Sequence, residues 1–182
     1  MPKLRIAILD YGVGNLRSVE RGLAYSGARA AITSDAEVIE SSDALILPGV
    51  GAFCDAIKEL KKFEKILKKN EKPLLGICLG MQLLFTESEE DGLHRGLNLM
   101  RGRVIRLPES VKIPQMGWNS ISIKRKSALL KGIKDGEYFY FVHSYYASGC
   151  NEVTVAATKY GVGVPAVVEK DLLFGTQFHP EK

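Results

Sequence analysis

The chain has 182 residues, of which 46% are hydrophobic and 25% charged, so its composition excludes a disordered chain and allows one domain with a full hydrophobic core. The net charge of +4 is mild and does not by itself predict a polyanionic partner. No apolar run reaches about 18 residues, and three cysteines without paired spacing build no disulfide framework, so we expect a cytoplasmic protein without an export signal or a membrane contact.

The first half of the chain alternates strand-like apolar runs with helical patterns. A strand is predicted at residues 4–9, and Asn15 is expected to cap the helix that follows it. Further strands are predicted at residues 28–33, 43–47 and 73–77. Because strands that alternate with helices form parallel sheets covered on both faces, this half predicts an α/β fold.

The rest of the chain differs in character from these elements. Residues 58–72 predict a lysine-rich amphipathic helix with a solvated charged face, and they lack the interleaved exposed aromatics typical of a nucleic-acid site. After residue 87 the chain becomes β-rich, which predicts antiparallel strands added to the same sheet within one domain of residues 1–182. The strands predicted there cover residues 103–107, 119–124, 138–146, 153–158, 164–169 and 173–178.

Cys78 stands between Gly76 and Gly80, where a predicted strand meets a predicted helix. Glycines let the backbone turn sharply at such a junction, which is the arrangement of the nucleophile elbow in serine hydrolases. A helix N-terminus also favours the reactive thiolate over the thiol. Two alternatives stay open. Cys78 can be a small buried hydrophobe, and Cys54 is a rival nucleophile although it lacks the elbow.

A possible base and its orienting group follow the last predicted strand, in the order His179, Pro180, Glu181. Residues i and i+2 of an extended segment point to the same side, so Glu181 can hold one nitrogen of the His179 ring while the other takes a thiol proton. Cys78, His179 and Glu181 are therefore predicted to be nucleophile, base and orienter. The three histidines are scattered without partners at ligand spacing, so we expect no metal and no cofactor.

Two backbone amides are candidates for binding the oxyanion that forms when a thiolate attacks a carbonyl. One is the N–H of Leu79, which directly follows the elbow cysteine. The other comes from the glycine-rich turn at residues 48–53, from either Val50 or Gly51. The same turn can also serve only as a tight connection into the next helix.

The elbow GICLGMQ and the closing FHPE resemble the motifs of class I (triad) glutamine amidotransferases. With PGVGAF, GLHRGL, KIPQMGWN and YFVHSYY, nearly the whole chain resembles the glutaminase subunit of imidazole glycerol phosphate synthase, from histidine biosynthesis. The resemblance implies a flavodoxin-like three-layer fold, in which Cys78 attacks the side-chain amide of L-glutamine and hydrolysis of the thioester gives glutamate. It also implies a (β/α)₈-barrel cyclase as the partner that captures the ammonia.

The same resemblance assigns further residues to roles. Val50 and Leu79 would supply the oxyanion amides from their backbones. Asn15, Met116 and Trp118 would lie toward the cyclase, although Trp118, the only tryptophan, can equally be a core residue. The residues expected to hold glutamine are Gly49, Gly51, Gln82, Glu90, His143, Ser144 and Tyr145.

Some points stay open at this level. His143 can be a satisfied core histidine or a residue that lines the site, and Gln115 stands where the family usually has histidine. The chain stops one residue after Glu181 whereas relatives continue, so we expect a C-terminal segment to be missing. One rival function is that of an anthranilate-type or aminodeoxychorismate-type glutaminase, against which Met81 and KIPQMGWN argue. The other rivals are a peptidase or chaperone-like protein of the same fold and an inactive regulatory subunit. Whether the oxyanion amides are preformed or depend on the partner is also open.

Overall fold

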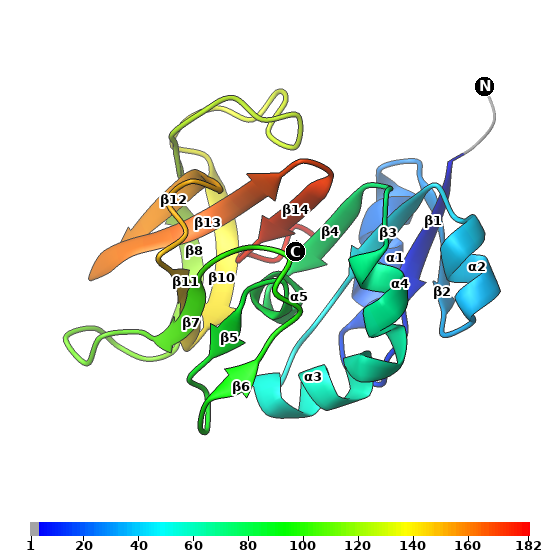
Figure 1. The fold of residues 1–182 in the computed structure, drawn as a ribbon. Helices are drawn as coiled ribbons and strands as arrows, with labels where there is room; N and C mark the ends of the chain where they lie inside the picture. Colours follow the sequence, from blue (N-terminus) through cyan, green and yellow to red (C-terminus); the bar gives the residue numbers. More distant parts are fainter. Residues whose placement is uncertain (1–3) are drawn as a thin grey trace.

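The centre of the molecule is an eight-stranded sheet, seen in a computed structural model that describes residues 4–182 (Figure 1). Its strand order is β2-β1-β3-β4-β14-β13-β12-β9. The parallel strands are β1 (Arg5–Leu9), β2 (Arg29–Thr33), β3 (Ala44–Leu47), β4 (Leu74–Ile77) and β14 (Leu173–Thr176). The antiparallel strands are β9 (Ser122–Ile123), β12 (Thr154–Tyr160) and β13 (Val162–Lys170). The predicted α/β sheet with added antiparallel strands is confirmed.

Apolar side chains cover both faces of the inner parallel strands β1, β3 and β4, which gives three layers. On β3, Leu45 and Leu47 belong to one buried cluster and Ile46 to another, because alternate residues of a strand point to opposite faces. The first cluster includes side chains of α2 (Ala36–Ser41), α3 (Phe53–Leu60), α4 (Glu64–Lys68) and α5 (Leu79–Leu83), and the second includes those of α1 (Leu16–Tyr25). Within residues 4–182, none of the helices combines the length and apolar character needed to cross a membrane.

Two smaller sheets carry the remaining strands, so only some of the strands predicted in the second half join the central sheet. A two-stranded ribbon consists of β8 (Gln115–Ser120) and β10 (Tyr138–His143). A four-stranded sheet has the order β11-β7-β5-β6, with β5 (Glu87–Ser88), β6 (His94–Arg95), β7 (Arg103–Arg106) and β11 (Tyr145–Ser148). Figure 1 shows both beside the antiparallel end of the central sheet.

The single strand predicted over residues 138–146 is in fact two strands in two sheets, which separate at Ser144. Before the break, β10 pairs with β8 as far as Gln115. Pro114 precedes Gln115 and has no backbone N–H with which to extend that ladder. After the break, β11 pairs with β7, and the Ser144 carbonyl accepts a hydrogen bond from the Leu107 N–H at 2.9 Å. The bend therefore follows from a change of pairing partner.

Two predictions at helix ends are also wrong. The helix predicted over residues 58–72 begins earlier, at Phe53, and α3 and α4 are separated by the 3₁₀ turn η1 (Lys61–Phe63). The buried residues on this segment start at Phe53, which explains the earlier start. Asn15 does precede α1, but its side chain makes no capping hydrogen bond; its backbone carbonyl accepts from the first turn instead.

Candidate active site

Cys78 occupies the tight turn that joins β4 to α5. Its φ of 52° and ψ of −109° are rare for a residue with a side chain and cost about 1–3 kcal/mol. The flanking glycines make the turn possible. A Cβ on Gly76 would lie 2.7 Å from the Gly80 carbonyl carbon, and a Cβ on Gly80 would lie 1.8 Å from the Leu47 carbonyl oxygen. The elbow geometry predicted from the glycine spacing is therefore present.

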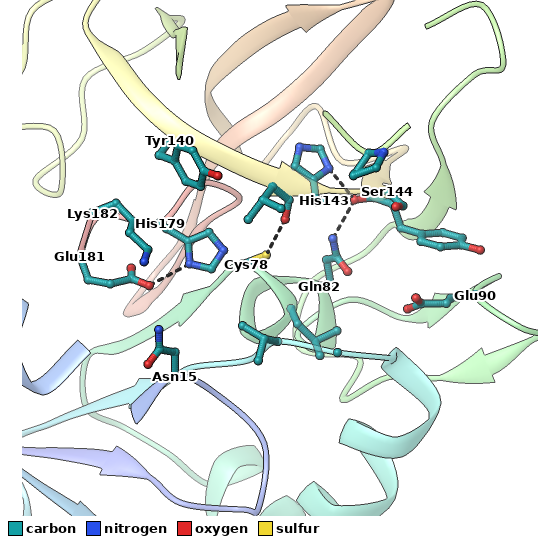
Figure 2. Close-up of a pocket in the computed structure, with 16 residues that line it drawn as sticks. Asn15, Cys78, Gln82, Glu90, Tyr140, His143, Ser144, His179, Glu181 and Lys182 are labelled. Atoms are coloured by element: carbon teal, nitrogen blue, oxygen red, sulfur yellow. Dashed lines mark hydrogen bonds and ion pairs between the residues drawn. The ribbon is translucent and has the colours of Figure 1, made fainter. Parts of the chain in front are cut away.

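The segment after β14 brings His179 and Glu181 to this elbow. The Cys78 N–H donates to the Thr176 carbonyl at 2.7 Å, and the His179 N–H donates to the Tyr140 carbonyl at 2.9 Å. His179 Nδ1 lies 2.8 Å from Glu181 Oε1 and donates to it. The His179 ring lies between Glu181 and Cys78 (Figure 2), and its Nε2 is buried without a hydrogen-bond partner among the described residues. The structure thus brings the predicted cysteine, histidine and glutamate together.

The electrostatics of the histidine and the glutamate suit a general base beside a thiol. Burial lowers the pKa of His179, but the side chains of Cys78 and Glu181 outweigh burial and hold that pKa above its ordinary value. Burial raises the pKa of Glu181, but the hydrogen bond and charge of His179, a backbone hydrogen bond and the charge of Lys182 together outweigh burial, and the net pKa is lowered. The pair is therefore a carboxylate beside a ring that readily accepts a proton.

The elbow and the His179–Glu181 pair face one cavity of about 520 Å³. Gly49 does not line the cavity, and an added Cβ there would lie 2.8 Å from the Gly80 nitrogen. Met116 and Trp118 lie outside the cavity. The predicted site residues that line it are Asn15, Val50, Gly51, Cys78, Leu79, Gln82, Glu90, His143, Ser144, Tyr145, His179 and Glu181.

The side of the cavity remote from Glu181 carries a second set of polar groups (Figure 2). The Tyr145 carbonyl accepts from Gln82 Nε2 at 2.8 Å and from His143 Nδ1 at 2.9 Å. Glu90 Oε2 accepts from the Phe53 N–H at 2.9 Å, and burial raises the pKa of Glu90. This side therefore offers a carboxylate, one side-chain amide and a positioned backbone to a polar ligand.

His143 is both a buried histidine and a residue of the cavity wall, so the two alternatives for it coexist. Burial, reinforced by the neighbouring His179, lowers the pKa of His143 to about 4, against the opposing hydrogen bond to Tyr145. Because a carbonyl can only accept, the proton of the neutral ring must be on Nδ1. The ring is therefore neutral at physiological pH.

We expect the protonation of His143, taken by itself, to lower the free energy of unfolding by about 2 kcal/mol when the pH falls from about 7 to about 5. The unfolded ring takes a proton near its ordinary pKa of 6.5, whereas the folded ring stays neutral until about pH 4, so acid favours the unfolded state. Urea unfolding of the wild type and of His143→Gln at both pH values measures this. A variant that keeps the full pH dependence would contradict the prediction.

The oxyanion donors remain predictions. The Leu79 amide belongs to the first turn of α5, where N–H groups have no intrahelical acceptor. Val50 lines the same cavity from the turn after β3, and Gly51 in that turn has a φ of 99°, a value that favours glycine.

Sequence reasoning missed other residues near the nucleophile. Pro114, Tyr140, Val142 and Lys182 also line the cavity. Tyr140 and Val142 lie two residues apart on β10, so the period of a strand places them on one face once either is assigned to the site. Gln177 was missed as well, although its side chain reaches Cys78 Sγ; its position two residues before His179 was the only hint.

A strained cysteine elbow with a buried His–Glu pair in one cavity defines a class of α/β enzymes that open amide bonds through a thiolate. Residues 7–182 match the family model "Glutamine amidotransferase class-I". The chain is also similar to proteins named imidazole glycerol phosphate synthase subunit HisH. It is 55% identical over 183 residues to that of Caldanaerobacter subterraneus subsp. tengcongensis and 54% over 181 residues to that of Methanothermobacter thermautotrophicus. Both alignments cover 97% of this chain and 90% of the relative.

Solved structures agree on the fold. PurLQS of Thermotoga maritima has a TM-score of 0.72 at 18% identity, with 98% of this chain and 88% of that chain covered. A glutamine amidotransferase of the same organism has a TM-score of 0.68 at 16% identity, with 100% and 77% covered. The chain belongs to the class-I glutamine amidotransferase family and, within it, to the HisH subunits of imidazole glycerol phosphate synthase. It is therefore an enzyme, and this membership decides against the anthranilate-type and peptidase alternatives.

Proposed function

We propose that this chain hydrolyses L-glutamine to glutamate and ammonia, with Cys78 as nucleophile. The observation that carries the proposal is the placement of a strained elbow cysteine beside a buried His179–Glu181 pair in one cavity. His179 Nε2 takes the thiol proton, and Sγ attacks the carboxamide carbon of glutamine. The protonated ring then gives its proton to the departing ammonia. Water, deprotonated by the same ring, finally hydrolyses the glutamyl thioester.

The remaining cavity residues have roles that fit this reaction. The amides of Leu79 and Val50 face the oxyanion of the tetrahedral intermediate, which is stabilised most when its donors are already in place. Glu90 suits the ammonium group of glutamine, because a carboxylate on the cavity wall attracts a cation. Gln82 and the backbone near Tyr145 suit the carboxylate and amide groups of the substrate.

Glutamate release from glutamine tests this function, with the chain alone and with an imidazole glycerol phosphate synthase cyclase and its nucleotide ligand. We expect slow hydrolysis alone and a sharp increase in the complex, with the ammonia consumed by the cyclase. A folded chain that releases no glutamate in either case would contradict the proposal. Full activity alone, unaffected by any cyclase, would contradict the partner but not the hydrolysis.

The proposed partner is a (β/α)₈-barrel cyclase that uses the ammonia in histidine biosynthesis, and the outer face of the β8–β10 ribbon is its proposed docking surface. Met116, Trp118 and Tyr138 are 63%, 59% and 61% exposed on that face. The Trp118 ring packs edge-on against Tyr140 with centroids 5.8 Å apart, and Tyr140 lines the cavity. An exposed apolar surface that continues into the mouth of a site suits a partner that receives the product.

The compartment we propose for this chain is a reducing cytoplasm, which fits the free cysteines Cys54, Cys78 and Cys150.

Trp118→Ala is expected to weaken cyclase binding about 10- to 100-fold, since exposed tryptophans at interfaces often carry much of the binding energy. Titration calorimetry with the cyclase measures the effect. Tyr25→Ala is the matched control, because Tyr25 is 97% exposed but lies away from this surface. It is the last residue of α1, about 15 Å along the helix from Asn15, the cavity residue that precedes α1. Equal binding by both variants would count against this surface.

A further inference from the structure

Gln177 is a fully buried glutamine for which the proposed reaction has so far no role. It directly follows β14, and its backbone N–H donates to the Ala166 carbonyl on β13 at 2.9 Å. Both polar atoms of its side-chain amide make hydrogen bonds. Oε1 accepts from Gln82 Nε2 at 3.0 Å, and Nε2 donates to Cys78 Sγ at 3.7 Å. Gln177 therefore contacts the reacting atom itself.

The direction of these hydrogen bonds follows from one fixed acceptor, the backbone carbonyl of Tyr145. A carbonyl only accepts, so Gln82 must turn its NH₂ group toward Tyr145, where the distance is 2.8 Å. The same NH₂ group also faces Gln177, so Gln177 must present its oxygen to Gln82. The nitrogen of Gln177 is then the end that faces Cys78. A reversed amide would oppose two donors, so the network itself selects an N–H that points at the sulfur.

We propose that Gln177 is a further catalytic residue, whose side-chain N–H donates to Cys78 Sγ and stabilises the thiolate before it attacks. This role rests on the proposed function of Cys78 as nucleophile. In the resting thiol, Sγ also contacts the Val142 carbonyl at 3.8 Å, an acceptor that suits an S–H group. When the proton moves from Sγ to His179 Nε2, that carbonyl loses its donor. The Gln177 N–H remains to face the negative sulfur.

The rate at which iodoacetamide alkylates Cys78 in the folded subunit tests this role. Mass spectrometry of the Cys78 peptide measures that rate. Gln177→Met has a similar volume without a donor, and Gln177→Asn keeps a buried amide that is one methylene too short. Either variant should be alkylated about tenfold more slowly than the wild type at about pH 7, because a hydrogen bond to a charged group is lost. At about pH 10, where thiols ionise without help, the rates should converge.

Gln115→Met is the matched control, since Gln115 is an equally buried glutamine whose nitrogen donates to Asn119 at 3.0 Å rather than to sulfur. It should be alkylated at the wild-type rate. Wild-type rates in both Gln177 variants at about pH 7 would overturn the proposal, and so would equal slowing at both pH values, which indicates distorted packing. Glutamine hydrolysis by the wild type, measured alongside, tests the proposed function separately, because alkylation requires no turnover.

Discussion

Cys78→Ser is expected to reduce glutamine hydrolysis about a thousandfold or more, in the chain alone and in its complex with the cyclase. The serine hydroxyl is nearly isosteric, so the elbow persists, but its proton is far harder to remove than that of a thiol and the resulting nucleophile is weaker. The His179–Glu181 pair is positioned for a thiol and does not compensate for the difference. Glutamate release under saturating glutamine measures the loss.

The same variant carries its own control. With ammonium salts in place of glutamine, the complex with the cyclase should form imidazole glycerol phosphate at the wild-type rate, because that reaction bypasses the cysteine. Cys54→Ser, which changes the rival nucleophile on α3, should keep full glutaminase activity. Hydrolysis that survives in Cys78→Ser and is lost in Cys54→Ser would reverse the assignment.

Gly80→Ala is expected to destabilise the fold by about 3 kcal/mol or more, a large share of the stability of a typical domain. The added Cβ would lie 1.8 Å from the Leu47 carbonyl oxygen and 2.8 Å from the Leu47 carbonyl carbon. Both are backbone atoms of the central sheet, so no flexible side chain can move aside. The first turn of α5 would have to move away from β3, and the elbow would open with it.

Guanidinium unfolding of Gly80→Ala and of Gly163→Ala tests this steric argument. Gly163 lies on β13, where an added Cβ would meet nothing within 4 Å, so its variant should unfold within about 0.5 kcal/mol of the wild type. Equal stability of the two variants would show that α5 can shift freely. It would also mean that the strained backbone at Cys78 does not depend on this close approach.

Cys78 and its neighbours illustrate what local sequence could determine. A short apolar run, two glycines around a cysteine and an apolar helix start are all contained in a dozen residues, and each acts through the local backbone. The pairing of His179 with Glu181 is local too, since it depends on a spacing of two in an extended segment. The parallel strands of the first half were likewise predictable, because they are continuous apolar runs separated by helical patterns.

Ser144 and Gln177 show which features only the tertiary structure decided. The break at Ser144 and the separate β8–β10 ribbon depend on which strand pairs with which, and pairing between distant segments leaves little trace in local sequence. Asn15 directly precedes α1, yet its side chain does not make the predicted capping hydrogen bond. Gln177 contacts Cys78 across 99 positions of the chain, and this contact exists only once β14 lies beside β4. Residue types and local spacing determined the chemistry, and long-range strand pairing decided which groups surround it.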